Sequence, residues 1–299
     1  MKDGLKTDQN IREGMLKNLW RLSLWCIADR RLPAPVISLY RRVFSRPFHQ
    51  NQRNIALEIT TACNIGCDQC NRSCGVQQAP SNEHMDLAQI DRFIEHSIGQ
   101  TRKWRQIVVA GGEPTLHPEF ATILSRLRNY RDNYSRNSRI VVVSNGHGAH
   151  VQKILATIPS DIIITNTNKT TPEKKGHASY NIAPRDVTFF QNKNFCEGCI
   201  VIEVCGMGLT RYGYYTCGPG ASVDRVFGFR LGILNLADAT PNRLREQRRL
   251  LCSYCGHFKD WGLHKCQTCE REQDHGAISC SWKTAYEGYR KKPPVLETM

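Results

Sequence analysis

The fold of this chain is decided by residues 55–70, which read IALEITTACNIGCDQC. The first six form a short, mostly apolar run with β-branched side chains, which predicts a buried strand. Cys63, Cys67 and Cys70 follow at once, in the spacing C-x3-C-x2-C. Three thiolates on one loop can bind three corners of an iron–sulfur cubane and leave its fourth iron open. Structural zinc takes four protein ligands, usually from paired C-x2-C knuckles, so zinc fits this spacing poorly.

Strand and helix patterns alternate along residues 55–165. Strands are also predicted at 106–110, 139–143 and 161–165, and helices at 86–98, 118–130 and 149–158. This alternation predicts parallel βα units of the α/β class, and such folds carry their chemistry at the C-terminal ends of the strands. Four units are counted, so we expect an α/β sheet or barrel. After about residue 170 the pattern decays, and a cysteine-rich, mostly irregular module is expected there.

The second and third predicted strands also end in loops that suit a ligand. Gly111, Gly112 and Glu113 follow the second strand. The two glycines allow a ligand to approach the backbone, and the carboxylate can receive an ammonium group. Ser144 and Asn145 follow the third strand as a polar turn. Each of these motifs is weak by itself.

Together, the three strand ends resemble the radical S-adenosylmethionine (SAM) superfamily over about residues 55–165. The resemblance implies that the three cysteines of the first loop hold a catalytic [4Fe–4S] cluster. It implies that the Gly-Gly-Glu motif binds the methionine end of SAM, and that Ser144 and Asn145 contact its ribose or carboxylate. The family often has an aromatic residue before the third cysteine, where this chain has Gln69, so adenine stacking must come from elsewhere. Its partial barrel usually has six βα units, whereas four are counted here, so the resemblance implies a shortened, partial parallel barrel capped by the cysteine-rich module.

Eight further cysteines lie between residues 199 and 280, which is the number that two fully ligated [4Fe–4S] clusters need. Their order is similar to the SPASM extension of radical SAM enzymes. Carried over by order, that resemblance implies a first auxiliary cluster held by Cys199, Cys205, Cys217 and Cys269. It implies a second one held by Cys252, Cys255, Cys266 and Cys280. The spacing from 255 to 266 departs from that family, so other arrangements stay open.

Two alternatives follow from this departure. A single auxiliary cluster, as in the shorter twitch extension, would use Cys199 or Cys205 with Cys217, Cys252 and Cys255. A zinc ribbon or rubredoxin-like knuckle would use the two C-x2-C pairs, at 252–255 and 266–269. The number and softness of the thiols favour two iron–sulfur clusters.

Three cysteines remain outside these sets. Cys26 lies on the apolar face of a predicted N-terminal helix, where a buried, inert thiol is expected. Cys74 and Cys196 lie next to the two cysteine groups in sequence. Either could donate a hydrogen atom to a substrate radical, as an epimerase requires, although a bystander role is favoured. His117 and His147 follow the ligand-binding loops, and we expect backbone groups rather than a substrate to satisfy them.

Composition sets further limits. The chain has 299 residues, 41 Lys and Arg against 27 Asp and Glu, and 14 cysteines. No apolar run approaches the roughly 18 residues of a membrane-spanning helix, and charges in the N-terminal segment argue against a signal peptide. We therefore expect a reducing cytoplasm, where clustered cysteines bind metal more often than they form disulfides. A hydrophobic share of 40% excludes wholesale disorder.

Three regions are predicted along the chain. Residues 1–54 carry 11 Lys and Arg against 4 Asp and Glu, and form a basic amphipathic helix with a linker. Residues 55–190 form the radical SAM core, and residues 191–299 form the auxiliary cluster domain. The N-terminal helix is expected to pack on the domain that follows, with a membrane-surface or partner contact as the alternative. Basic residues at 169–175 and 225–230 are expected to form solvated faces, with attraction of a phosphate or carboxylate group as the alternative.

The resemblance implies an enzyme that cleaves SAM reductively to a 5′-deoxyadenosyl radical, which abstracts a hydrogen atom from the substrate. An electron donor such as flavodoxin or ferredoxin is implied as a partner. Because the chain is basic and shows no peptide-recruiting domain, we favour oxidation or rearrangement of a small, anionic or carbohydrate-type substrate. Modification or epimerisation of a peptide is the alternative. A metal-stapled nucleic-acid-binding or regulatory protein is disfavoured, because it has no use for a carboxylate aimed at an ammonium group.

Overall fold

The computed structural model describes residues 48–74, 82–169, 173–174, 179–261 and 277–299, which belong to one unit that begins at Phe48. The predicted N-terminal helix, with Cys26, lies outside the described residues, and so do Cys266 and Cys269. Among the helices that the structure describes, none is long and apolar enough to cross a membrane.

A six-stranded sheet organises this unit, in the order β5-β4-β3-β1-β7-β8. Its strands are β1 (Asn54–Thr60), β3 (Gln106–Gly111), β4 (Arg139–Ser144), β5 (Ile163–Asn166), β7 (Met207–Thr210) and β8 (Gly213–Tyr215). All of them run parallel except β8, which returns antiparallel to β7. The sheet ends at β5 and β8, and is therefore open within the described part of the chain. The C-terminal ends of five strands share one edge, where parallel sheets carry their sites.

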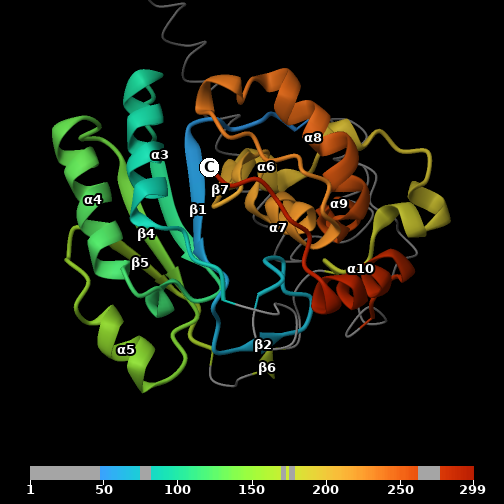
Figure 1. Ribbon diagram of the computed structural model, residues 1–299, viewed down its shortest axis with the longest axis horizontal. Helices are drawn as coiled ribbons and strands as arrows, with labels where there is room; N and C mark the ends of the chain where they lie inside the picture. The colour runs from blue at the N-terminus through green and yellow to red at the C-terminus, as the bar shows by residue number, and fades with distance from the viewer. Residues whose placement is uncertain (1–47, 75–81, 170–172, 175–178, 262–276) are drawn as a thin grey trace, which may run out of the picture. The chain divides into compact units, whose positions relative to one another are not determined.

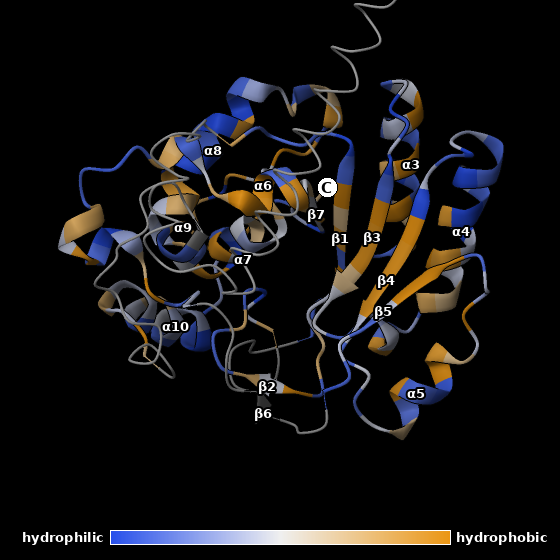
Figure 2. Cartoon of the chain, turned by 180° about the vertical axis from the view of Figure 1, so that it is seen from behind, coloured by the Kyte–Doolittle hydropathy of each residue, from blue (hydrophilic) through white to orange (hydrophobic). Residues whose placement is uncertain are grey.

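Helices on one side of the sheet form the main core with it (Figure 1). They are α3 (Leu87–Gly99), α4 (Phe120–Asn133) and α5 (Ala149–Leu155). Side chains alternate along a strand, so Ile55, Leu57 and Ile59 of β1 all enter this core. The apolar character of β3, β4 and β5 is visible in Figure 2. α3 begins at a capping box, in which the Asp86 carboxylate accepts from the Gln89 backbone and the Gln89 side chain accepts from the Asp86 backbone.

The C-terminal helices lie on the other side of β1 (Figure 1). They are α6 (Ile200–Val204), α7 (Gly218–Phe227), α8 (Pro241–Tyr254), α9 (Gly256–Trp261) and α10 (Cys280–Lys291). A Cβ added to Gly208 of β7 would lie 2.7 Å from the backbone of Cys217 and of Gly218, so this glycine permits α7 to approach the sheet. Glu58 of β1 points away from the main core and pairs with Arg225 of α7. A second apolar core joins α7, α8 and α10.

Short elements complete the loops. β2 (Gly66–Cys67), within the cysteine loop, pairs in parallel with β6 (Glu173–Lys174). The 3-10 turns of the described residues are η1 (Pro114–Leu116), η2 (Pro184–Asp186), η3 (Thr188–Phe190), η4 (Phe195–Glu197) and η5 (Leu236–Asp238).

The predicted order of strands and helices over residues 55–165 is confirmed, with shifts of a few residues at their ends. The expectation of a mostly irregular C-terminal module is wrong, because α7, α8 and α10 have 10, 14 and 12 residues. β7 adds a fifth parallel strand to the four that the sequence predicts. It has only four residues, one of them Gly208, and therefore shows too little periodicity to be recognised. The division between 55–190 and 191–299 stays a prediction, although β7 and β8 complete the sheet begun by the first region.

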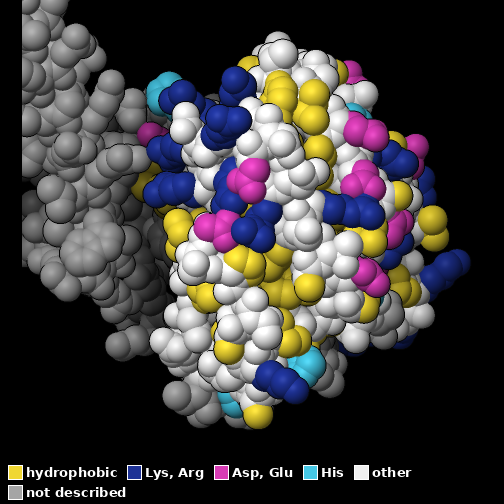
Figure 3. Space-filling model, turned by 90° about the vertical axis from the view of Figure 1, so that its left-hand side faces the viewer, with side chains coloured by type: hydrophobic (Ala, Val, Ile, Leu, Met, Phe, Trp, Pro, Cys, Tyr) yellow, Lys and Arg dark blue, Asp and Glu magenta, His cyan; other side chains and the backbone are white. Residues whose placement is uncertain are grey.

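Positively and negatively charged side chains are interspersed on the surface formed by α3 and α4. On the face that Figure 3 shows, Lys and Arg side chains are interspersed with Asp and Glu. Arg126 of α4 pairs with Asp91 of α3, and Arg128 lies 3.0 Å from Asp161. Such exposed pairs stabilise a protein by about 0–1 kcal/mol each. This face therefore lacks the single-sign patch that is typical of nucleic-acid binding.

Candidate functional site

The three cysteines of the first loop lie close together after the C-terminal end of β1. Cys67 is buried, while Cys63 and Cys70 are half-buried. Burial raises the pKa of Cys63 to about 11, and the charges of Cys70 and Cys67 raise it as well. All three thiols lie within eight residues of one another on this loop. The Lys169 ammonium lies 3.3 Å from Cys67 Sγ, and would offset part of the negative charge of three thiolates.

The Gly-Gly-Glu loop packs directly against the cysteine loop. The Gly112 backbone N–H donates to the Thr60 carbonyl at 2.9 Å. A Cβ added to Gly112 would lie 2.3 Å from Ala62 O and 2.8 Å from Cys63 Cβ. A Cβ added to Gly111 would lie 2.3 Å from Thr60 O. Neither position has room for a side chain, so the contact between the two loops requires both glycines.

Glu113 is fully buried, and donors from two loops hold its carboxylate. It accepts hydrogen bonds from the backbone N–H and the hydroxyl of Thr115, at 3.2 and 2.8 Å. It also accepts from the Ser144 hydroxyl at 3.0 Å and from the Asn145 backbone N–H at 2.7 Å. Glu113 therefore connects its loop to the end of β4. An ammonium group bound at this carboxylate would be one more hydrogen-bond donor beside those of Thr115, Ser144 and Asn145.

Asn145 connects the end of the third strand to the cysteine loop. Its side-chain amide donates to Asn64 Oδ1 at 2.9 Å and lies 3.9 Å from Cys63 Sγ. Its Oδ1 accepts from the His147 backbone N–H at 2.7 Å, and Asn64 donates to the His147 carbonyl at 2.7 Å. The three strand-end loops that the sequence singles out thus meet at one place.

Gln69, which stands at the family's aromatic position, binds the C-terminal region of the chain. It is buried and has a φ of 57°. Its Oε1 accepts from the Asn181 backbone N–H at 2.6 Å, and its amide donates to the Ala277 carbonyl at 2.7 Å. Both polar ends of the side chain are therefore engaged in holding the cysteine loop against residues of the C-terminal half.

Backbone groups satisfy the histidine after the Gly-Gly-Glu loop. His117 is buried, its Nε2 lies 2.8 Å from the Met85 carbonyl, and its Nδ1 accepts from the Glu119 backbone N–H at 2.9 Å. The expectation for His117 is thus confirmed. His147 Nδ1 likewise lies 3.2 Å from a backbone carbonyl, that of Lys169.

A second cysteine group forms in the C-terminal half from four buried thiols, those of Cys199, Cys217, Cys252 and Cys255. Burial raises the pKa of all four, to about 11 for Cys217, and every pair among them interacts by charge. The SPASM resemblance assigns Cys199 and Cys217 to one cluster and Cys252 and Cys255 to another, whereas in the structure the charges of all four thiols act on one another. Cys205 is exposed at the end of α6, and its charge acts on Cys199 and Cys217.

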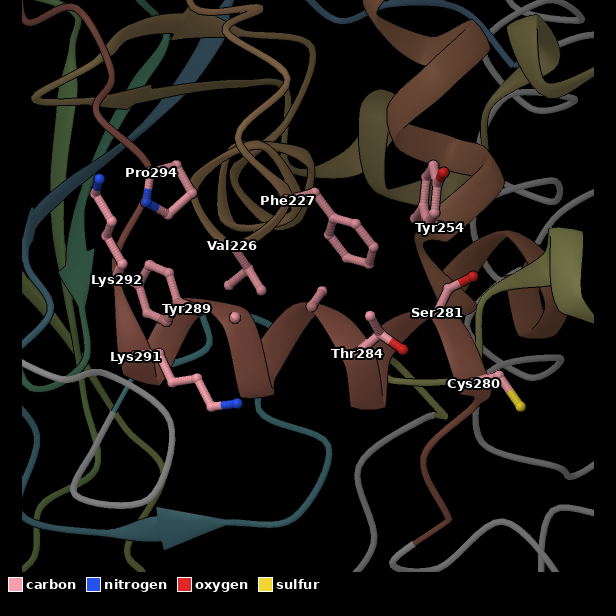
Figure 4. A pocket seen from close by; sticks show the side chains of 12 residues that line it. Val226, Phe227, Tyr254, Cys280, Ser281, Thr284, Tyr289, Lys291, Lys292 and Pro294 are labelled. Atoms are coloured by element: carbon pink, nitrogen blue, oxygen red, sulfur yellow. The ribbon is translucent and has the colours of Figure 1, made fainter.

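Cys280 has a different environment. It is exposed at the first residue of α10 and lines an open groove of about 820 Å³. Figure 4 shows Cys280 at one end of this groove, with Phe227 of α7 and Tyr254 of α8 along its wall. The other two cysteines predicted as ligands, Cys266 and Cys269, lie outside the described residues.

The two candidate hydrogen donors belong to different cysteine groups. Cys74 is buried next to the first group, its thiol donates to the Arg72 carbonyl at 3.1 Å, and Arg225 Nη2 lies 3.8 Å from its Sγ. Burial raises the pKa of Cys74 well above its ordinary value, so its thiol stays protonated. Cys196 is buried near the second group, where its charge acts on Cys252.

The donor chemistry of both groups fits iron–sulfur clusters. Soft thiolates are the ligands that such clusters take, and a cubane spreads its ligands over separate irons. Three cysteines in the first group would leave one iron open, while four in the second can ligate a cluster fully. Within the described residues, no group of three or more His, Cys, Asp or Glu side chains is arranged to hold a single metal ion.

Charged residues that belong to none of the sequence motifs, and that were therefore not predicted, also lie at the site. Glu58 and Arg225 are buried, and Arg72 lies 3.6 Å from Glu58. The expectation of a solvated face at 225–230 is therefore wrong for Arg225. A single carboxylate in an apolar strand is a usable signal, because a buried charge needs a partner. The sequence does not show which of 41 cations that partner is.

Fold and site together define an α/β protein whose parallel strands carry a three-cysteine loop beside a glycine-rich loop. Residues 57–160 match the model of the radical SAM superfamily, so the chain carries a radical SAM domain. The chain is 26% identical over 107 residues to a GTP 3′,8-cyclase of Corynebacterium glutamicum, and 25% identical over 107 residues to that of strain R of the same species. Each match covers 36% of this chain and 28% of the relative.

Solved structures of BtrN are also similar to this chain. A crystal structure of BtrN in complex with AdoMet and 2-DOIA has a TM-score of 0.41 at 14% identity, covering 75% of this chain and 98% of that one. A crystal structure of BtrN in an open conformation has a TM-score of 0.37 at 14% identity, covering 74% and 94%.

Proposed function

We propose that this enzyme cleaves SAM reductively and abstracts a hydrogen atom from a small, anionic or carbohydrate-type substrate, which is then oxidised or rearranged. The bound cluster and SAM would supply the 5′-deoxyadenosyl radical. One observation carries the proposal: Asn145 holds Glu113 through its backbone and approaches Cys63 through its side chain, so the three loops form one site. A protein that only stored iron would not need the second and third loops.

The chain's own residues divide the binding of the two cofactors among the three loops. The three cysteines of the first loop would each ligate one iron. The backbone at Gly111–Gly112, which packs directly against the cysteine loop, would receive the methionine end of SAM. Glu113 would hold that loop in place through Ser144 and Asn145. Lys169 would partly neutralise the charge at Cys67.

We further propose one auxiliary [4Fe–4S] cluster, ligated by Cys199, Cys217, Cys252 and Cys255. Their burial and the charge effects between every pair support it. This is the single-cluster alternative of the sequence analysis rather than the two-cluster pairing. A further cluster would have to combine Cys280 with Cys266 and Cys269. In an oxidation, the auxiliary cluster is where an electron from the substrate radical would go.

The substrate class is proposed from charge. Lys169 places a cation beside the first loop, and the chain has a net charge of +14. Both features favour an anionic substrate. The relatives are named for a reaction of GTP, but the match covers 28% of their length. The match therefore does not extend to a shared substrate.

A cytoplasmic setting, with flavodoxin or ferredoxin as the electron donor, is part of the same proposal.

A second candidate function is radical epimerisation, of a peptide or of a small molecule, and Cys74 favours it. Its thiol is protonated and lies next to the first cysteine group. Transfer of the thiol hydrogen to a substrate carbon radical would leave a sulfur radical on Cys74, which one electron and one proton from the reductant and solvent restore. In deuterated water the epimerised product would carry one deuterium, whereas an oxidised product would not.

The test is an anaerobic assay of reconstituted protein with SAM and dithionite. We expect 5′-deoxyadenosine from the wild type and about a hundredfold less from a variant with Cys63, Cys67 and Cys70 replaced by Ala. Gly112→Ala should lose about tenfold or more, because its Cβ displaces the cysteine loop. Gly99→Ala is the matched control, because a Cβ there meets nothing within 4 Å. No 5′-deoxyadenosine from wild-type protein that contains the first cluster would contradict the proposal.

A further inference from the structure

Arg72 lies two residues after Cys70, yet its guanidinium packs beside the second cysteine group. A Cβ added to Gly218 would lie 1.7 Å from Arg72 Nη1 and 2.4 Å from its Cζ. Gly218 directly follows Cys217 and begins α7. The guanidinium therefore rests on the backbone next to Cys217, in a place that any side chain at position 218 would occupy.

Two buried residues hold Arg72 in this position. Glu58 Oε2 lies 3.6 Å from Arg72 Nη1, and Glu58 Oε1 pairs with Arg225 Nη1. Arg225 also donates a hydrogen bond to the Arg72 carbonyl. The side chains of Glu58 and Arg225 are 2% and 3% exposed, so water screens these charges little. Two guanidinium groups against one carboxylate leave one positive charge in excess.

Arg248 of α8 is a second buried cation at the same group, and is 7% exposed. Its Nε donates to the Cys196 carbonyl at 2.8 Å, and its Nη1 donates to Thr216 Oγ1 at 3.3 Å. Thr216 directly precedes Cys217.

We propose that Arg72 and Arg248 compensate the charge of the auxiliary cluster and raise its reduction potential, and that Arg72 holds this cluster in place relative to the first loop. The inference rests on the proposed auxiliary cluster. A [4Fe–4S]²⁺ cluster with four thiolates has a net charge of about −2, and reduction adds one negative charge. Buried cations next to it stabilise the reduced form, and thereby make the cluster a better electron acceptor.

The test is a redox titration of the auxiliary cluster followed by EPR. The titration uses the background in which Cys63, Cys67 and Cys70 are Ala, so that only the auxiliary cluster contributes. We expect Arg72→Gln to lower the ratio of reduced to oxidised cluster about tenfold at a given potential, which is 59 mV for a one-electron couple. Arg72→Lys keeps the charge and should lower this ratio less.

Gly218→Ala displaces the guanidinium without removing it, so it should shift the potential in the same direction as Arg72→Gln. Arg128→Gln, which removes an exposed arginine of α4, should leave the potential unchanged. If Arg72→Gln prevents cluster assembly, the potentials measured in Arg72→Lys and Gly218→Ala test the inference instead.

Two results would overturn different claims. A full auxiliary cluster with the wild-type potential in both Arg72→Gln and Gly218→Ala would overturn this inference and leave the proposed cluster intact. A wild-type chain with only about four irons would instead remove the auxiliary cluster from the proposed function, and this inference with it.

Discussion

At the scale of single residues, the site depends on two glycines, Gly111 and Gly112, that contact the neighbouring backbone too closely for any side chain to fit. The Gly-Gly pair predicts a place where a ligand can approach the backbone. In the structure, the neighbour that Gly112 meets is the protein itself, at Ala62 and Cys63. The cysteine loop can therefore pack in its observed position only because residue 112 is glycine and has no Cβ.

His117 makes the stability of the fold dependent on pH. Burial lowers the pKa of His117, and its Nδ1 accepts from the Glu119 backbone N–H, which requires that nitrogen to be unprotonated. A group with a lowered pKa in the folded state contributes its full stability above the unfolded pKa of about 6.5. That contribution is lost as the pH falls towards the lowered, folded pKa.

We therefore expect His117→Asn, which keeps an acceptor for Glu119 but does not titrate, to flatten this dependence. The free energy of unfolding, measured with urea at about pH 7.5 and about pH 5.5, should fall less in the variant than in the wild type. An equal decrease in the free energy of unfolding between the two pH values in both proteins would show that His117 does not cause the pH dependence.

At the scale of elements, a buried ion pair joins β1 to α7. Glu58 is the charged residue on a strand whose other side chains are mostly apolar. Because the period of a strand is two, it points away from the core that Leu57 and Ile59 enter. α7 reaches it because Gly208 lets the start of this helix lie against β7.

Arg225→Met should destabilise the fold by about 3–5 kcal/mol, because it leaves the Glu58 carboxylate buried without its main partner. Adding Glu58→Leu to this variant should restore most of the loss, since an apolar pair of similar size needs no compensation. Urea unfolding of the two single variants and the double variant measures the coupling. Arg128→Met, at an exposed pair, should cost at most about 1 kcal/mol. A double variant as unstable as Arg225→Met would refute the pairing.

At the scale of the whole molecule, the second cysteine group is assembled from segments that are far apart in the chain. Cys199 precedes α6, Cys217 caps α7, and Cys252 and Cys255 lie at the end of α8. The packing of these three helices against one another would therefore determine which thiols share the proposed auxiliary cluster.

Metal analysis of the reconstituted protein tests this assembly. We expect about eight irons per chain in the wild type and about four in Cys252→Ala, because the auxiliary cluster is lost. Cys280→Ala, which changes an exposed cysteine of α10, should keep about eight. About twelve irons in the wild type, reduced by Cys280→Ala, would instead establish a further cluster. One zinc per chain would instead support a zinc knuckle formed by the C-x2-C pairs at 252–255 and 266–269.

The elements of residues 55–165 could be predicted because their signals are local. The run at 139–143 is β-branched throughout after its first residue, and Asp86 with Gln89 forms a capping box before an amphipathic run. Beyond residue 170 the local signals mislead. α7 begins Gly-Pro-Gly, which is typical of a turn, although a proline in the first turn of a helix costs no hydrogen bond.

The amino-acid sequence by itself placed three thiols within eight residues of one another directly after a strand, so that a single loop can bring them together. It also determined that Gly-Gly-Glu and Ser144-Asn145 end neighbouring strands, because parallel βα units bring such ends to one edge. Only the tertiary structure decided the partners of Glu113, of Glu58 and of Cys217. Those contacts join segments separated by 30 to more than 150 residues, where the packing of helices on the sheet, and not the chain's local preferences, sets the distances.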